Sequence, residues 1–231
     1  MIAFLKKQWI FVVSLIVLCG VILFLFMQAL TPQKDLKIYS PADVNPELAD
    51  STIWHISRHH TIAPFAFTNQ NGKIVTNKDY EGKIYVADFF FTTCPTICPI
   101  MADNMEWLQD KITDMPDVML LSHSVTPDID SVPVLRAYAD RKGAIDGKWN
   151  LVTGKKEDIY YIARKSYLAV KTTRSSDLYN MVHTENFVLV DKKGRIRGFY
   201  DGTNLDAEKE DGTKNVKQLL EDIKWLREHG D

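Results

Sequence analysis

Beyond residue 60 the chain alternates between two kinds of apolar pattern, and this alternation restricts it to one broad class of fold. Continuous apolar runs, typical of strands buried in the centre of a sheet, occupy 83–91, 118–125 and 149–152. After each run the apolar residues recur every three or four positions, the period of one buried helix face, over 97–112, 132–141 and 157–168. This order favours an α/β sheet with helices on both faces.

Two hairpin signals flank the alternating region. Asn71-Gly72 separates two β-rich runs within 65–76, and an Asn-Gly pair favours the tight turn of a hairpin. A second hairpin is expected over 187–200, where Lys192-Lys193-Gly194 supplies the turn. An amphipathic helix over 216–226 then closes the fold. We therefore predict an α/β domain with a central mixed sheet flanked by helices.

An apolar segment of membrane-spanning length precedes this domain. Trp9 to Leu30 carries no charged residue, and about twenty apolar residues are what a helix needs to cross the hydrocarbon core. Lys6 and Lys7 lie just before it, and positive charge remains on the cytoplasmic side, so the rest of the chain is expected outside the cytoplasm. A cleaved signal peptide is the alternative, but the run is long for one and no small-x-small site ends it. We predict an uncleaved, single-pass anchor.

The chain is thus expected to have three parts. Residues 1–30 form a short cytoplasmic stub and the anchor, 31–60 form a proline-containing spacer, and 61–231 form the folded domain. With 45% hydrophobic and 25% charged residues, the composition is that of a globular protein. A formal net charge of −2, without a cluster of lysines and arginines, argues against nucleic-acid binding.

Cys94 and Cys98 are the only cysteines outside the apolar N-terminal segment, where Cys19 is expected to have no function. They lie between the 83–91 strand and the 97–112 helix, at the kind of strand end where open α/β sheets bind ligands. A helix N-terminus favours the thiolate form, and two residues four apart on a helical turn can both face one metal ion. A structural disulfide is the alternative for an exported pair, but closing so short a loop restrains little chain entropy.

A third metal ligand is expected at another strand end. His183 lies just before the 187–191 strand, and in a sheet of this type that loop faces the N-terminus of the first helix. Two thiolates select Cu(I), and an added imidazole lets the same ligand set accept Cu(II). We expect Asp88 to be a satisfied strand residue and His123 to lie near the edge that carries Cys94. The other histidines are expected to be exposed: His55, His59, His60 and His229.

These motifs resemble the Sco/SenC family of membrane-anchored, thioredoxin-fold proteins, which bind copper and assist cytochrome c oxidase assembly. The matching segments are Phe89 to Pro99, His183 to Phe187, Asp191 to Arg195 and the hairpin with Phe67 to Gly72. The resemblance covers the whole exported domain. It implies a thioredoxin-like fold with Cys94, Cys98 and His183 as ligands of a copper ion, Cu(I) or Cu(II). One residue differs from the family pattern, because Thr126 stands where an aspartate is common, although the following acid, Asp130, is present.

Two functions fit this resemblance. The first is a metallochaperone in the bacterial inner (plasma) membrane, with its C-terminal domain on the periplasmic or extracytoplasmic side. It would take copper from an upstream donor and pass it to the binuclear site of cytochrome c oxidase subunit II or a similar copper-receiving protein. The alternative is a thiol-disulfide oxidoreductase, in which Cys94 and Cys98 are a redox-active pair that reduces the target's cysteines before metallation. His183 favours the chaperone, because thiol exchange needs no imidazole.

A peroxidase of the peroxiredoxin type is a third possibility that the sequence disfavours. Its motif places a proline and a hydroxyl residue at fixed distances before the reactive cysteine. Counted back from Cys94, these positions hold Ala87 and Phe91. Neither residue can supply the required chemistry.

Overall fold

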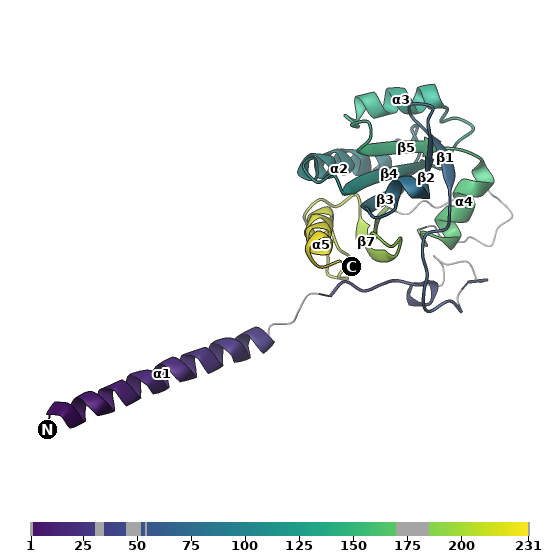
Figure 1. The fold of residues 1–231 in the computed structure, drawn as a ribbon. Coiled ribbons are helices and arrows are strands. Elements are labelled where there is room, and N and C mark those ends of the chain that lie inside the picture. The colour runs from purple at the N-terminus through teal and green to yellow at the C-terminus, as the bar shows by residue number, and fades with distance from the viewer. Residues whose placement is uncertain (1, 31–34, 45–51, 54, 170–184, 231) are drawn as a thin grey trace. The chain divides into compact units, whose positions relative to one another are not determined.

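The computed structural model describes residues 2–30, 35–44, 52–53, 55–169 and 185–230. The chain divides into two compact units, Met1–Asp35 and Leu36–Asp231. The described part of the first unit is mainly one long helix, α1 (Ile2–Leu30) (Figure 1). The large apolar side chains of Trp9 and of the stretch from Phe11 to Met27 are exposed. Within the part of the chain that the structure describes, no helix combines the length and the apolar character that crossing a membrane requires.

The second unit is built on a seven-stranded sheet of order β2-β1-β5-β4-β3-β6-β7. Its strands are β1 (Ala66–Asn69), β2 (Ile74–Thr76), β3 (Ile84–Phe90), β4 (Val118–Ser124), β5 (Trp149–Thr153), β6 (Asn186–Val190) and β7 (Ile196–Asp201). The three central strands β3, β4 and β5 run parallel, and every other pairing is antiparallel. This confirms the predicted mixed sheet and both predicted hairpins.

Among the described residues, four α-helices cover the two faces of this sheet: α2 (Ile97–Lys111), α3 (Val132–Arg141), α4 (Lys156–Lys165) and α5 (Val216–His229). Two short 3-10 helices, η1 (Pro41–Asp43) and η2 (Asn77–Tyr80), lie in the connections. Side chains of α2, α3 and α5 belong to the apolar cluster on one face, and those of α4 belong to the cluster on the other. Figure 1 shows α2 and α4 on opposite sides of the strands. The predicted covering of both faces is therefore confirmed.

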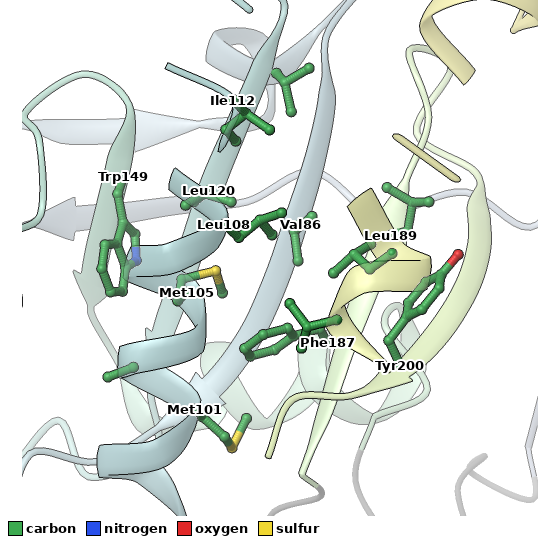
Figure 2. Packing of buried hydrophobic residues seen from close by; sticks show 14 of the residues in the cluster. Val86, Met101, Met105, Leu108, Ile112, Leu120, Trp149, Phe187, Leu189 and Tyr200 are labelled. Atoms are coloured by element: carbon green, nitrogen blue, oxygen red, sulfur yellow. The ribbon is translucent and has the colours of Figure 1, made fainter. Parts of the chain in front are cut away.

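Helix α2 packs through the stripe that its sequence period predicts. Met101, Met105, Leu108 and Ile112 are all buried, and Figure 2 shows the first three lying over the sheet among side chains from β3, β4, β5 and β6. Burying side chains of this size stabilises the fold by about 1.5–3 kcal/mol each. This packing fixes the helix against the strands, and with it the position of the cysteines at its N-terminus.

Part of the expected spacer belongs to the second unit. Leu36 is buried, and its carbonyl oxygen accepts hydrogen bonds from the guanidinium of Arg197 on β7 (2.6 and 3.2 Å). The Tyr39 N–H donates to the Ile196 carbonyl oxygen (2.9 Å), which adds a short antiparallel bridge to the edge strand. The compact unit begins at Leu36, and this segment satisfies groups at the exposed edge of β7.

Candidate functional site

The cysteine pair follows directly from the central strand. β3 is buried along its whole length, and its chain leaves the sheet through a turn in which the Cys94 N–H donates to the Phe91 carbonyl oxygen (3.2 Å). Helix α2 begins at Ile97, one residue before Cys98, with Pro99 in its first turn, where the missing N–H costs no helical hydrogen bond. Cys94 thus lies before the helix and Cys98 lies within its first turn, as the sequence predicts.

The two sulfurs have different surroundings. Cys94 Sγ accepts a hydrogen bond from the backbone N–H of Cys98 (3.5 Å) and lies 3.9 Å from the Thr96 hydroxyl oxygen. Cys94 is 7% exposed and Cys98 only 1%, so Cys94 is the thiol that a partner can approach. Both thiols are free rather than joined in a disulfide.

These surroundings separate the protonation of the two thiols. Burial acts to raise the pKa of Cys94, but the backbone N–H groups of Thr96 and Cys98 outweigh it, and the pKa falls below its ordinary value. Burial raises the pKa of Cys98 to about 12, and its hydrogen bond to Cys94 and the nearby charges of Cys94 and Asp88 act in the same direction. Cys94 is therefore the readier thiolate, and Cys98 holds its proton in the metal-free protein.

A buried carboxyl group lies beneath the pair. Asp88 on β3 lines the same small cavity as Cys98, about 10 Å³ in volume, together with Ser122 and Trp149. Burial raises the pKa of Asp88 to about 7, and its Oδ1 has no hydrogen-bond partner among the described residues. The expectation of a satisfied strand residue is therefore wrong for Oδ1, because α2 covers this face of β3, although a hydrogen bond with the Ser122 side chain acts to lower the pKa of the carboxyl.

His123 faces away from the cysteines. It pairs in register with Phe89 on β3, and its ring stacks on that phenylalanine with centroids 4.9 Å apart. The rings of Phe67 (5.6 Å) and Tyr167 (5.2 Å) complete an aromatic enclosure on the α4 face of the sheet. Burial lowers the pKa of His123 to about 3, so the imidazole is neutral at ordinary pH. His123 lies near the predicted edge of the sheet, but on the face opposite to that of Cys94 and Cys98.

His60 is also buried, contrary to the expected exposure. Its Nε2 lies 2.7 Å from the Ser166 carbonyl oxygen, just beyond the last residue of α4. Carbonyl groups at a helix end lack partners within the helix, and the imidazole supplies one. His60 therefore has a structural role, whereas His55, His59 and His229 are exposed as predicted.

The predicted third ligand, His183, lies outside the described residues. The first described residue after it in the sequence is Glu185, whose carbonyl oxygen accepts a hydrogen bond from the Gly202 N–H (2.6 Å). The Gly202 carbonyl oxygen in turn accepts from the side-chain amide of Asn104 on α2 (2.8 Å). Within the described ranges, no group of three or more His, Cys, Asp and Glu side chains is placed to hold a metal ion. The ligand set of Cys94, Cys98 and His183 stays a prediction.

The structure reveals one further residue, Asp130, that contacts the turn before Cys94. It is fully buried, and its carboxylate accepts hydrogen bonds from the hydroxyls of Thr92 (2.5 Å), Ser124 (2.6 Å) and Thr126 (3.0 Å). The sequence singled out Asp130 and Thr126, but not their connection to the segment before Cys94. No local pattern could have found it, because Thr92 and Asp130 meet only through the pairing of β3 with β4.

The sequence of this domain matches a known protein family. The SCO1/SenC family model matches residues 55–221. The chain belongs to the SCO1/SenC family. It is 35% identical over 147 residues to the SCO1 protein homolog of Bacillus subtilis (strain 168), covering 62% of this chain and 75% of that protein. It spans only 49% of the human mitochondrial SCO1 homolog, to which it is 27% identical.

Solved Sco structures share the fold. A SCO1/SenC family lipoprotein from Bacillus anthracis str. Ames superposes with a TM-score of 0.61 at 32% identity, over 73% of this chain and 95% of that one. BsSco, a Sco family cytochrome c oxidase assembly protein with a disulfide switch, gives 0.58 at 30%, over 71% and 92%. Copper-bound ScoI of Arabidopsis thaliana gives 0.55 at 29%, over 72% and 98%. The recognised family and the thioredoxin-like mixed sheet with flanking helices are confirmed.

Proposed function

We propose that this Sco protein binds copper through Cys94, Cys98 and His183 and acts as a metallochaperone in cytochrome c oxidase assembly. The observation that carries the proposal is the hydrogen bond from the Cys98 N–H to Cys94 Sγ at the N-terminus of α2, which keeps two unbridged sulfurs together. Soft sulfur ligands of this kind select Cu(I). The similarity to copper-bound Arabidopsis ScoI and to BsSco supports the same cargo and pathway.

The two thiols take unequal parts in binding. A cysteine binds copper as the thiolate, so metal binding releases whatever protons the thiols carry. Cys94 gives up its proton more readily, and Cys98, with a pKa of about 12, needs the metal to displace its proton. Release to the binuclear site of oxidase subunit II, or to a similar acceptor, then proceeds as incoming thiolates replace these ligands one at a time. An upstream donor loads the protein by the reverse exchange, in which the ligands of this protein replace those of the donor one at a time.

In this proposal α1 holds the protein in the bacterial inner membrane, with the second unit on the periplasmic or extracytoplasmic side. The support is the charge-free run from Trp9 to Leu30, the preceding Lys6 and Lys7, and the exposed apolar side chains of the helix. The related Bacillus anthracis protein is a lipoprotein.

The test of the chaperone is metal binding by the full chain, purified in detergent under anaerobic, reducing conditions. We expect about one copper ion per chain, and loss of tight binding in Cys94→Ser, Cys98→Ser and His183→Ala, because each removes a proposed ligand. The matched control is His229→Ala, which removes an exposed imidazole on α5 and should leave binding unchanged. Full affinity in His183→Ala would remove that histidine from the ligand set.

Thiol-disulfide exchange is the second candidate, and the difference in protonation of the thiols favours it. Exchange begins with attack by a thiolate, which Cys94 supplies, while the protonated Cys98 remains to close the disulfide in the second step. The oxidoreductase would replace the chaperone if His183→Ala kept full copper affinity and the oxidised protein exchanged rapidly with a thioredoxin-like dithiol.

A further inference from the structure

Asp130 connects two loops at the edge of the sheet that carries the cysteines. Its carboxylate accepts four hydrogen bonds, from the Thr92 hydroxyl, the Thr92 N–H, the Ser124 hydroxyl and the Thr126 hydroxyl. The side chain is fully buried and acts only as an acceptor. Hydrogen bonds to a carboxylate are stronger than those between neutral groups, so this connection is stiff.

The connection reaches the turn that ends at Cys94. Thr92 lies inside the turn closed by the hydrogen bond from the Cys94 N–H to the Phe91 carbonyl oxygen. Just before it, the Val125 N–H donates to the Phe90 carbonyl oxygen (2.8 Å), so the end of β3 is joined to the chain after β4 both at Phe90 and at Thr92 itself. The direction in which the chain leaves this turn determines where Cys94 Sγ lies relative to the N-terminus of α2.

Thr126 fits the same arrangement. Its hydroxyl donates to Asp130 and its N–H donates to the Ser124 hydroxyl oxygen (3.2 Å). An aspartate at position 126 would place a second carboxylate beside Asp130, and neither carboxylate could donate a hydrogen bond to the other. With threonine, a donor replaces that charge and Asp130 is the single acceptor of the cluster.

We propose that Asp130 is a positioning residue for the thiol pair, holding Cys94 Sγ against the Cys98 N–H through Thr92. This deepens the proposed function, on which its relevance to copper rests, but its own test needs no metal. Two thiols held in one place have a high effective concentration toward each other, which favours their disulfide over the dithiol.

The test is the equilibrium of the full chain in detergent, with Cys19→Ser, against a glutathione redox buffer. Cys94 and Cys98 form one S–S bond and lose two protons and two electrons, while one glutathione disulfide is reduced to two glutathione thiols. We expect Asp130→Asn and Thr92→Val each to shift the equilibrium toward the dithiol by about threefold to tenfold, tenfold being about 30 mV. The double variant should shift no further than the larger single change, since both variants disrupt the same connection between Thr92 and Asp130.

Two variants separate positioning from a general loss of stability. Thr92→Ser keeps the donating hydroxyl and should restore the wild-type equilibrium. Asp222→Asn alters another buried aspartate, on α5, which accepts from the Tyr200 hydroxyl of β7 (2.6 Å) and from Lys214 in the segment before α5 (2.8 Å). It should lower the free energy of unfolding without moving the thiol equilibrium.

An unchanged equilibrium in Asp130→Asn and Thr92→Val, additive shifts, or an equal shift in Asp222→Asn would each overturn the inference. If Asp130→Asn does not fold, Thr92→Val and Thr92→Ser carry the comparison. Copper titration of the unmodified chain tests the chaperone separately from the positioning by Asp130. A chain that binds no copper but shows the expected shifts refutes the chaperone alone, and a chain that binds copper without the shifts refutes the positioning alone.

Discussion

At the scale of single residues, the sheet separates groups that are neighbours in sequence. Asp88 and Phe89 are consecutive, yet Asp88 faces Cys98 and α2 while Phe89 stacks on His123 on the opposite face. Successive side chains of a strand point to opposite faces, so each of the two ionisable side chains, Asp88 and His123, has its own surroundings. Burial acts on both in the same physical sense, raising the pKa of the acid and lowering that of the base, because it disfavours the charged forms.

His123 should make stability depend on pH in a defined range. In the folded protein its pKa is about 3, against 6.5 for an ordinary histidine, so below pH 6.5 the unfolded chain takes up a proton that the folded protein does not. Stability is therefore lost as the pH falls from about 6.5 toward 3. Between pH 7 and pH 5 this amounts to about 2 kcal/mol. The free energy of unfolding, measured with urea at pH 7 and at pH 5, should therefore fall by about 2 kcal/mol less in His123→Phe than in the wild type.

The control for this prediction is His229→Ala, which changes an exposed histidine and should keep the wild-type dependence on pH. A His123→Phe protein with the same pH dependence as the wild type would show that another group causes the loss.

At the scale of elements, local patterns predicted the secondary structure closely. The strands β3 to β5, both hairpins and the helices α2, α3 and α5 form where the periods of the sequence place them. The exception is the end of α4, expected at Leu168 but observed at Lys165. The chain turns there because the Tyr167 N–H reaches back to the Ile162 carbonyl oxygen (2.9 Å) and Leu168 adopts a positive φ of 53°. The helix end is also held by a tertiary contact, between the His60 imidazole and the Ser166 carbonyl oxygen, which a helical period in the sequence does not reveal.

The element-scale prediction concerns α1. If this helix is the anchor, the protein should remain in the membrane fraction of cells after alkaline carbonate extraction, and its second unit should be digested by protease added to spheroplasts. A version beginning at Asp35 should appear in the soluble fraction. Full-length protein extracted by carbonate, or protected from the protease, would contradict the anchor or its orientation.

At the scale of the whole molecule, the second unit includes more chain than its sequence patterns suggest. The segment from Leu36 to Val44 lacks any sustained period, yet it covers part of the edge strand β7. Arg197 holds it in place, donating both to the Leu36 carbonyl oxygen and to the carboxylate of Asp191 (3.0 Å). A segment of this kind depends on contacts with residues far along the chain, so local patterns do not predict it.

Arg197→Met should release this segment. The change leaves the Leu36 carbonyl oxygen and one side of the buried Asp191 without their partner, and losing one member of a buried ion pair costs about 3–5 kcal/mol. We expect a lower free energy of unfolding and at least tenfold faster hydrogen exchange of the Tyr39 amide, which bonds to Ile196. Arg136→Met removes more exposed interactions, with Asp140, Asp146 and Asn71, and should change neither quantity much. Unchanged Tyr39 exchange in Arg197→Met would show that the segment is held in another way.

The sequence by itself determined the order of strands and helices, the place of Cys94 and Cys98 at the end of the central strand, and the family. These features depend on periods and motifs within a few residues, which are visible without the fold. The tertiary structure alone decided that Cys94 and Cys98 differ in protonation, that His123 lies across the sheet from them, and that Asp130 reaches Thr92. The physical reason is that burial and hydrogen bonding between distant residues arise only when parallel strands pair and α2 covers one face of the sheet.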